Sequence, residues 1–557
     1  MHDHRANSTV GPSYSSGVAG DQIARNRNMA ANPAGLGAQS GTLQHYNAAV
    51  DLIERNLAAR PDKTAYIDEY GRYSFAELAE RTNRCANALT GLGLSMEARV
   101  MVCLTDTIDF PAVFLGAIKA GLVPVAVNTL LTSNDYSFML RDSRAQALIV
   151  SEPLLPVFKT ILDDQPFLKH VVVSGGNPSG NLQLAALMAS AGSNFAAAPT
   201  CADDACFWLY SSGSTGTPKG TVHLQTSPIQ TAELYGQPVL GIQECDVVFS
   251  AAKLFFAYGL GNALSFPLSV GATTVLLSER PTPASVCRIL RQHKPTIFYG
   301  VPTLYSALLA SPELPKREEL NLRRCTSAGE ALPPDVGRRW LEHTGVDILD
   351  GLGSTEMLHI FLSNRPGDVR YGTSGKPVPG YDIRLIDEQG KPAARGEIGE
   401  LQVAGPTSAA FYWNNREKSR NTFLGQWTRS GDKYIESEDG YFTYCGRADD
   451  MLKVSGIWVS PFEVEAALAS HEAVLEAAVV GHPDENQLIK PKAFIVLQPN
   501  VSQTPELAGL LQQHVKSRLA PYKYPRWIEF VTELPKTATG KIQRFKLRTA
   551  ASAQDLI

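Results

Sequence analysis

Apolar runs that alternate with helix-patterned segments constrain the fold of this chain more than any other feature. Residues 74–92 repeat apolar side chains at helical spacing, and the same alternation resumes between 247 and 299. Four further apolar runs have the length of strands: 64–67, 99–104, 147–150 and 171–173. Strands separated by helices predict an α/β fold with mostly parallel, doubly wound sheets.

The pattern changes twice toward the C-terminus. Between 380 and 403 it becomes short strands with glycine turns, typical of a small antiparallel sheet or barrel. A charged strip, RADD at 447–450, then precedes a mixed unit of roughly a hundred residues. We therefore predict an N-terminal domain at 41–447 and a C-terminal domain at 448–557. Residues 1–40 are polar and lack the apolar core of a signal peptide, so we predict a disordered tail there.

Composition excludes several classes of protein. The 557 residues carry a net charge of −4, so neither nucleic acid nor an anionic membrane surface is an expected partner. The most apolar stretch, 110–131, is interrupted by Lys119, Gly121 and Pro124, which indicates a buried helix, a turn and a strand rather than a membrane span. The eight cysteines lack the spacing of a zinc site. Reduced thiols in a cytoplasm are the expected setting.

The loop YSSGSTGTPKG at 210–220 is the most informative motif. Glycines and hydroxyl groups let a backbone close around phosphate. A Ser/Gly loop is more often a flexible connector. The positive charge of Lys219 favours the phosphate-binding interpretation. Pro218 precedes Lys219, so this is not the Gly-Lys pair of a Walker A loop. The segment 535–541 does end in Gly-Lys, but it begins with proline. A P-loop nucleotidase is therefore disfavoured.

The loop resembles the phosphate-binding signature of the adenylate-forming superfamily, which includes acyl-CoA synthetases, peptide-synthetase adenylation domains and luciferases. Five further segments resemble its other motifs in the same order: SAGEAL at 327–332, DGLGSTE at 350–356, TRSGDK at 428–433, GRADD at 446–450 and PKTATGK at 535–541. The resemblance covers about residues 46–548. It implies two doubly wound sheets plus a small β-barrel-like subdomain in the large N-terminal domain, and a small mobile α+β C-terminal domain.

The resemblance implies a phosphate-binding group and a nucleotide-binding group. The residues implied to hold the phosphates are Ser211, Ser212, Ser214, Thr215, Lys219 and Thr355. Glu356 is implied as the Mg²⁺ ligand, with an ordinary surface glutamate as the alternative. Adenine would lie against Gly329, Glu330 and Ala331, beside Asp350 and Gly351, and ribose against Asp432 and Arg447, where a plain loop salt bridge is the alternative. Leu352 stands where the family often has an aromatic residue.

The family also implies a catalytic lysine and a hinge. Lys541 would offset the charge that accumulates as the carboxylate attacks phosphorus. Rotation of the C-terminal domain would turn on Asp449, which could equally be a surface charge. Lys453, Ser455 and Gly456 would then line a passage for coenzyme A. Because Lys541 lies in a context that resembles a site of reversible lysine acylation, an acyltransferase and a deacylase are candidate partners.

Two segments indicate the acid. Those that resemble the acid pocket of benzoate–CoA ligases contain Phe256, Ala257, Tyr258, Gly353, His359 and Ile360. They predict a flat aromatic slot, although Phe256 and Tyr258 could be core aromatics. Ala257 stands where amino-acid-activating domains usually offer a carboxylate. His359 could bond a ring substituent, so hydroxy- and aminobenzoates stay open.

The predicted function is ATP-dependent activation of an aromatic acid, benzoate or a close analogue, to an acyl-adenylate, followed by thioester formation with coenzyme A. ATP and coenzyme A are substrates, Mg²⁺ is the expected metal, and a homodimer is left open. The alternatives are transfer of an aryl or short-chain acid to a carrier protein, a ligase for a substituted benzoate, a luciferase-type oxygenase and a non-catalytic scaffold. We expect no attached carrier domain, because little sequence follows the 535–541 motif, and a scaffold would be expected to lose Glu356, Asp432 or Lys541.

Overall fold

The computed structural model describes most of the chain. The described residues are 45–176, 178–211, 218–447, 450–454, 457–485, 488–499, 501–536, 542–544 and 546–548, with the backbone alone at 453, 457, 458 and 521. The tail predicted at 1–40 lies outside them. Among the helices of this described part, none is both long and apolar enough to cross a membrane.

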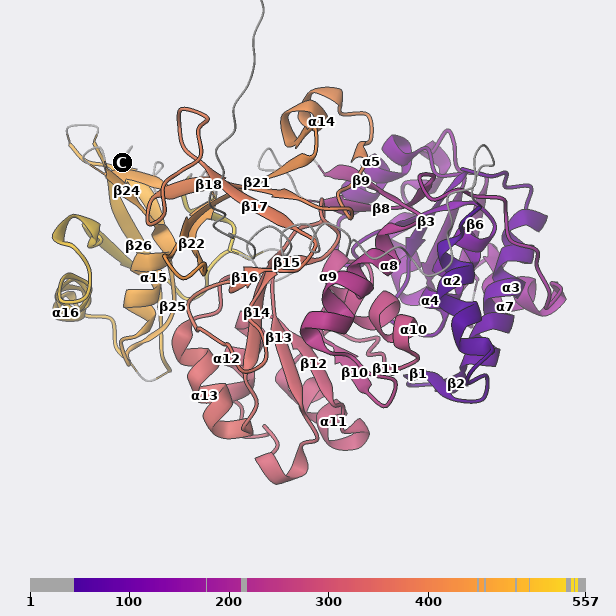
Figure 1. Cartoon of the computed structure of the whole chain (residues 1–557), viewed down its shortest axis with the longest axis horizontal. Coiled ribbons are helices and arrows are strands. Elements are labelled where there is room, and N and C mark those ends of the chain that lie inside the picture. The colour runs from indigo at the N-terminus through magenta and orange to yellow at the C-terminus, as the bar shows by residue number, and fades with distance from the viewer. Residues whose placement is uncertain are drawn as a thin grey trace, which may run out of the picture. The chain divides into compact units, whose positions relative to one another are not determined.

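One of the two large sheets has eight strands in the described residues and carries the 210–220 loop between β8 and β9 (Figure 1). Its order is β19-β9-β8-β4-β3-β5-β6-β7. The strands are β3 (Arg99–Cys103), β4 (Val123–Ala126), β5 (Ala147–Ser151), β6 (His170–Ser174), β7 (Leu182–Gln183), β8 (Ala205–Ser211), β9 (Lys219–Leu224) and β19 (Phe411–Tyr412). The pairs from β8 to β7 are parallel, and those of β9 with β8 and β19 are antiparallel.

The other large sheet has nine strands in the described residues, in the order β16-β15-β14-β13-β12-β10-β11-β1-β2. They are β1 (Thr64–Asp68), β2 (Gly71–Ser74), β10 (Val247–Ser250), β11 (Thr273–Val275), β12 (Ile297–Gly300), β13 (Arg324–Ser327), β14 (Ile348–Gly353), β15 (Ile360–Ser363) and β16 (Lys376–Pro377). The inner pairs are parallel, as predicted. Every residue of β12 is buried, because helices cover both faces of such a sheet and leave no polar side to a strand.

Helices connect these strands. They are α2 (Ala48–Leu57), α3 (Phe75–Gly91), α4 (Asp109–Lys119), α5 (Ser133–Ser143), α6 (Leu155–Phe158), α7 (Leu184–Ser190), α8 (Ser227–Thr231), α9 (Ala257–Leu260), α10 (Phe266–Val270), α11 (Pro283–His293), α12 (Pro302–Leu309) and α13 (Pro334–Thr344). Two π-helical segments, Ala232–Leu240 and Gly261–Ser265, lie among them. Short 3₁₀ turns are Glu152–Leu154, Leu162–Asp164, Arg317–Glu319 and Pro521–Lys523.

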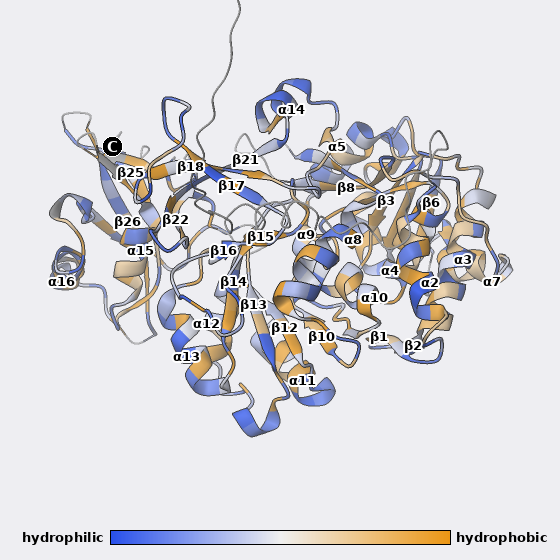
Figure 2. Cartoon of the chain, viewed as in Figure 1, coloured by the Kyte–Doolittle hydropathy of each residue, from blue (hydrophilic) through white to orange (hydrophobic). Residues whose placement is uncertain are grey.

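Sequence signals explain where these helices begin and which face they bury. Ser74 caps α3 and exchanges hydrogen bonds with Glu77 in a capping box. Helix α2 contacts both α4 and α10, so the core is continuous from one large sheet to the other. Figure 2 shows polar stretches on α11 and α13 beside the largely apolar β12 and β14, the pattern of amphipathic helices on a buried sheet. The segment 110–131 forms α4 and β4, as predicted.

The predicted small β subdomain is an antiparallel sheet of five strands in the described chain. They are β17 (Asp382–Ile386), β18 (Ile398–Ala404), β20 (Phe423–Leu424), β21 (Trp427–Glu436) and β22 (Phe442–Arg447), with α14 (Arg416–Thr422) before β20. β21 pairs with β18, β20 and β22, so it is the central strand. The glycine-turn texture of the sequence therefore predicted this change of architecture correctly.

The C-terminal residues form a small α+β unit, as predicted. Its elements are β23 (Leu452–Val454), β24 (Ile457–Val459), α15 (Pro461–Ala469), β25 (Val474–Pro483), β26 (Ile489–Leu497), α16 (Pro505–Lys516) and β27 (Trp527–Phe530). Helices α15 and α16 contact each other and share one apolar cluster with one face of β25 and β26, while the alternate residues of these strands belong to a second cluster. The domain boundary at 447/448 remains a prediction.

Candidate active site

The phosphate corner, which we define as Ser211, Lys219, Thr355, Glu356 and Tyr412, joins three distant parts of the sequence. Ser211 ends β8 and Lys219 begins β9 directly opposite it. Ser212, Ser214 and Thr215, between them, lie outside the described residues. Lys219 is largely buried, and burial lowers the pKa of its ammonium, while the nearby Glu356 carboxylate opposes that shift.

The Glu356 side chain is held mainly by a residue that sequence reasoning missed. The Tyr412 hydroxyl donates to Glu356 Oε1 at 2.7 Å. Lys219 Nζ lies 3.9 Å from the same oxygen, 3.5 Å from the Tyr412 hydroxyl and 4.5 Å from the centre of its ring. Ser211 Oγ reaches Oε1 at 3.5 Å. Lys219, predicted for the phosphates, and Glu356, predicted for Mg²⁺, therefore lie close together, and Tyr412 contacts both.

The backbone of Thr355 and Glu356 is fixed by two further contacts. His223 Nε2 donates to the Thr355 carbonyl at 2.8 Å, and the Ala409 amide donates to the Glu356 carbonyl at 2.7 Å. His223 is buried against Phe207, with ring centroids 5.2 Å apart, and burial lowers its pKa to about 4. The imidazole is therefore neutral at physiological pH and acts as a fixed donor. Nothing in the sequence near His223 signals this contact.

The residues predicted for adenine meet because β13 and β14 are parallel neighbours. Ser327 and Asp350 are paired in register, so the loop with Gly329, Glu330 and Ala331 follows β13 beside Asp350 and Gly351. Burial raises the pKa of Asp350 to about 8. The Leu332 amide lies 3.5 Å from its Oδ2, and Oδ1 has no partner among the described residues. Such an orphaned buried acceptor fits an amine donor from a ligand.

The two residues predicted for ribose are paired across a hairpin. Asp432 on β21 lies opposite Arg447 on β22, and Arg447 Nη1 is 3.0 Å from Asp432 Oδ1 and 3.0 Å from the Ser430 carbonyl. Gly431 has φ +74°, and a Cβ there would lie 2.8 Å from Arg447 Nη2. The positive φ favours glycine at this turn, and a Cβ there would also displace the Arg447 guanidinium.

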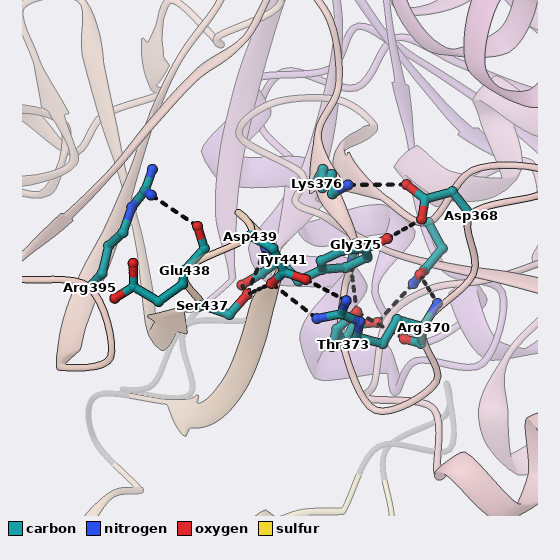
Figure 3. Close-up of polar contacts among 11 residues, drawn as sticks. Asp368, Arg370, Thr373, Gly375, Lys376, Arg395, Ser437, Glu438, Asp439 and Tyr441 are labelled. Carbon is teal, nitrogen blue, oxygen red and sulfur yellow. Dashed lines mark hydrogen bonds and ion pairs between the residues drawn. The ribbon is translucent and has the colours of Figure 1, made fainter.

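A cluster at the far end of this hairpin ties it to the loop after β15 (Figure 3). Arg370 lies over the Tyr441 ring at 3.8 Å and Lys376 at 4.3 Å, so the ring is contacted by two cations. Arg370 also pairs with Asp439, at 3.1 Å from Nη1 to Oδ1, and the Tyr441 hydroxyl donates to Asp368. The hairpin that carries Asp432 is thereby anchored near the strand that carries Asp350.

The acid slot, which we define as Phe256, Ala257, Tyr258, Gly353, His359 and Ile360, also assembles. Phe256 precedes α9, which contains Ala257 and Tyr258, and Gly353 on β14 pairs with Ile360 on β15. A Cβ at Gly353 would lie 2.7 Å from the His359 carbonyl, so only glycine fits there. The Tyr258 hydroxyl lies 2.5 Å from Thr326 Oγ1.

His359 is neutral and enclosed by aromatic rings. Its Nε2 lies 3.2 Å from the Tyr258 carbonyl and 3.1 Å from Asn262 Oδ1, so Nε2 carries the proton. The Phe266 ring is 4.5 Å away and the Tyr235 ring 5.4 Å. Burial lowers the pKa of His359 to about 3. Asn262, Phe266 and Tyr235 were missed, because the sequence does not say which residues of a neighbouring helical segment face a site.

The predicted C-terminal site residues are described only in part. Lys541, Asp449, Ser455 and Gly456 lie outside the described residues, and Lys453 has its backbone alone in β23. Two ion pairs flank these positions. Arg544 pairs with Glu465 of α15 at 2.7 Å, with both side chains about nine-tenths buried, and Arg548 pairs with Asp450 at 2.7 Å. The residues after Lys541 are thus tied to a helix and to the neighbour of Asp449.

Comparison with known proteins agrees with this arrangement. The family model for AMP-binding enzymes matches residues 53–413, and that for the AMP-binding enzyme C-terminal domain matches 463–541. A benzoate–CoA ligase of Thauera aromatica is 66% identical over 510 residues, 91% of this chain and 96% of the relative. A 4-hydroxybenzoate–CoA/benzoate–CoA ligase of Rhodopseudomonas palustris is 52% identical over 513 residues, 91% of this chain and 94% of the relative.

A solved structure has the same fold. The crystal structure of a benzoate CoA ligase from Burkholderia xenovorans matches with a TM-score of 0.85 and 53% identity, covering 90% of this chain and 100% of that one. The chain belongs to the AMP-binding enzyme family.

Proposed function

We propose that this chain joins benzoate to AMP with release of pyrophosphate and then transfers the benzoyl group to coenzyme A, giving benzoyl-CoA and AMP. The observation that carries the proposal is the 66% identity, over 91% of the chain, to a relative named benzoate–CoA ligase. The uncharged aromatic slot agrees with it, because His359 is neutral and Ala257 offers no carboxylate to an amino acid. Relatives named as CoA ligases do not favour transfer to a carrier protein.

Two steps are needed because a carboxylate is a poor acceptor for a thiol. In the first, a benzoate oxygen attacks the α-phosphorus of ATP and pyrophosphate leaves. Ser211, Ser212, Ser214, Thr215 and Lys219 hold the β- and γ-phosphates, and Thr355 bonds the α-phosphate. In the second, the CoA thiol gives up its proton, its sulfur attacks the acyl carbon and AMP leaves. The activated bond supplies the driving force that a free carboxylate lacks.

Glu356 is proposed as the protein ligand of Mg²⁺. Among the described residues, all polar contacts of its carboxylate are to Oε1, so Oε2 can face a cation. Mg²⁺ prefers one or two carboxylates plus substrate phosphates, and no group of three or more ligating side chains lies in the described part of the chain. When bound, the ion neutralises charge on the polyphosphate as pyrophosphate forms.

The nucleotide is proposed to lie across β13 and β14. Asp350 accepts from the adenine amine, with the backbone of Gly329, Glu330, Ala331 and Gly351 along the ring. The orphaned Oδ1 of Asp350 supports this role. Asp432 accepts from the ribose hydroxyls, with Arg447 beside it. Leu352 provides aliphatic contact where the family often stacks an aromatic ring.

The C-terminal residues are proposed to serve the two steps in turn. Lys541 brings a positive charge to the α-phosphate and the benzoate carboxylate during adenylation. The 448–557 domain then turns about Asp449, and Lys453, Ser455 and Gly456 line the passage for coenzyme A. The Arg548–Asp450 ion pair supports a link between the hinge and the segment after Lys541.

The test is benzoate-dependent exchange of pyrophosphate into ATP, followed by addition of coenzyme A. We expect exchange with benzoate, a CoA-dependent loss of free thiol, and weaker exchange with 4-hydroxybenzoate and 2-aminobenzoate. Lys541→Ala should cut exchange by about 100-fold or more. Exchange without thioester formation would contradict transfer to CoA. Absence of exchange with benzoate would contradict the proposed substrate.

Regulation and setting are further parts of the proposal. Acylation of Lys541 by an acyltransferase removes the lysine's charge and stops adenylation, and a deacylase restores the charge. The chain works in the cytoplasm. Sedimentation measures whether it forms a homodimer. Enzyme acetylated at Lys541 should lose pyrophosphate exchange. Full exchange with loss of thioester formation alone would overturn this mode of control.

A further inference from the structure

Tyr412 lies at the centre of the phosphate corner, although no motif singled it out. Its hydroxyl receives a hydrogen bond from Lys219 Nζ at 3.5 Å and donates to Glu356 Oε1 at 2.7 Å. A carboxylate oxygen can only accept, so the Tyr412 hydroxyl is the donor in the 2.7 Å bond to Glu356. The three groups form a directional chain from ammonium to hydroxyl to carboxylate.

The position of Tyr412 is fixed by its own surroundings. It lies on β19, which pairs with β9 so that Tyr412 is opposite Thr221. Its amide donates to Ser419 Oγ at 3.0 Å, and its ring lies 5.2 Å from that of Phe423. The side chain is 3% exposed. A hydroxyl held this firmly keeps its direction when a ligand enters.

We propose that Tyr412 is a positioning residue that holds Oε1 of Glu356 and so presents Oε2 to the metal of the metal–ATP complex. Without nucleotide, Lys219, Ser211 and Tyr412 all approach Oε1, and the 2.7 Å bond from Tyr412 is the shortest of these contacts. When the polyphosphate binds, Lys219 and Ser211 turn to the phosphates, because both belong to the proposed phosphate-binding group. The Tyr412 hydrogen bond then keeps the carboxylate from rotating, so the carboxylate meets the metal in one orientation. The inference rests on the proposed function of Glu356 and adds the residue that orients it.

The experiment measures Mn²⁺ binding by electron paramagnetic resonance in the presence of ATP and the absence of benzoate, so that no turnover occurs. Tyr412→Phe should weaken binding of the Mn²⁺–ATP complex about tenfold, because binding would then have to fix the Glu356 rotamer that Tyr412 holds in the wild type. Tyr371→Phe is the matched control, because the Tyr371 hydroxyl also donates to a carboxylate, Asp347 Oδ1, at 2.7 Å. Asp347 precedes β14 and Glu356 follows it, so the two carboxylates lie beyond opposite ends of this strand. It should leave binding unchanged.

A double-mutant cycle separates positioning from a general structural effect. In a Glu356→Gln background, Tyr412→Phe should change Mn²⁺–ATP binding by less than about twofold, because the carboxylate it orients is gone. In turnover, Tyr412→Phe should raise the KM for MgATP and leave the KM for benzoate unchanged. Equal binding in wild type and Tyr412→Phe, or a full loss that persists in the Gln background, would overturn the inference. Failure of the proposed function would instead appear in the wild type, as absent benzoate-dependent exchange.

Discussion

The phosphate corner and the acid slot both take residues from the segment 353–360, where β14 ends and β15 begins, yet one region keeps charged side chains and the other has none. In the phosphate corner, Lys219 and Glu356 are paired, and their side chains keep 15% and 16% exposure. In the acid slot, burial keeps His359 neutral and raises the pKa of Tyr258 well above its usual value. Charge is retained where polyphosphate would bind and is absent where an aromatic ring would. A fixed charge facing the ring would cost desolvation without a partner.

Glu356→Gln should give the largest effect in the phosphate corner. Removing the charge that would meet the metal should lower kcat/KM for MgATP by about 100-fold or more at saturating benzoate. Glu279→Gln is the control, because Glu279 is paired with Arg288 at an exposed site. Steady-state kinetics measure both. A decrease in kcat/KM for MgATP smaller than about threefold would mean that the Glu356 carboxylate is not required for the reaction.

Tyr258→Phe should give a smaller effect, confined to the acid slot. The change leaves Thr326 Oγ1 without its 2.5 Å partner and loosens the ring, so the benzoate KM should rise about fivefold. The KM for MgATP should stay constant. Thr326→Val should have a similar effect, and the double variant should be no worse than either single one. An equal rise in both KM values would contradict a separate role for the acid slot.

Asp350→Asn sharpens the comparison, because Asp350 has a carboxyl group, as Glu356 does, but is buried, as His359 is. Burial raises its pKa to about 8, so the folded protein binds this proton more tightly than the unfolded chain does. The free energy of unfolding of the wild type should therefore fall as pH rises from about 4 toward about 8. The asparagine variant has no proton to lose at this position, so its stability should not show this fall. The Tm of the variant minus that of the wild type should grow by a few degrees over this range in scanning calorimetry. A constant difference would mean that Asp350 titrates normally.

The smallest expected effect is the pH dependence of benzoate binding. The pKa of His359 is lowered to about 3 and that of Tyr258 is raised, so neither group changes charge near neutrality. The benzoate KM at saturating MgATP should therefore vary less than about twofold between about pH 6 and 8. A transition near pH 6.5 that disappears in His359→Gln would show that the imidazole is charged in this range.

Several elements of the fold could be predicted from the sequence. The doubly wound sheets followed from the alternation of strands and helices, and β17 and β18 from their glycine turns, because these patterns are local. The order of six motif-like segments indicated the family, and Asp432 and Arg447, both predicted for ribose, are adjacent in space. The roles of the site residues stay predictions, and Lys541, Asp449, Ser455 and Gly456 also lie outside the described residues.

What the sequence alone determined was the fold class, the family resemblance and the residues that carry charge. Only the tertiary structure decided that Tyr412 and His223 hold the Thr355–Glu356 turn, that Asn262 fixes His359, and that Asp350 keeps an oxygen without a partner in the described chain. Tyr412 and Glu356 are 56 residues apart and Asn262 and His359 are 97 apart. Periodicity reports which face of an element is buried, but a hydrogen bond between distant segments depends on how whole sheets pack, and no local pattern encodes that.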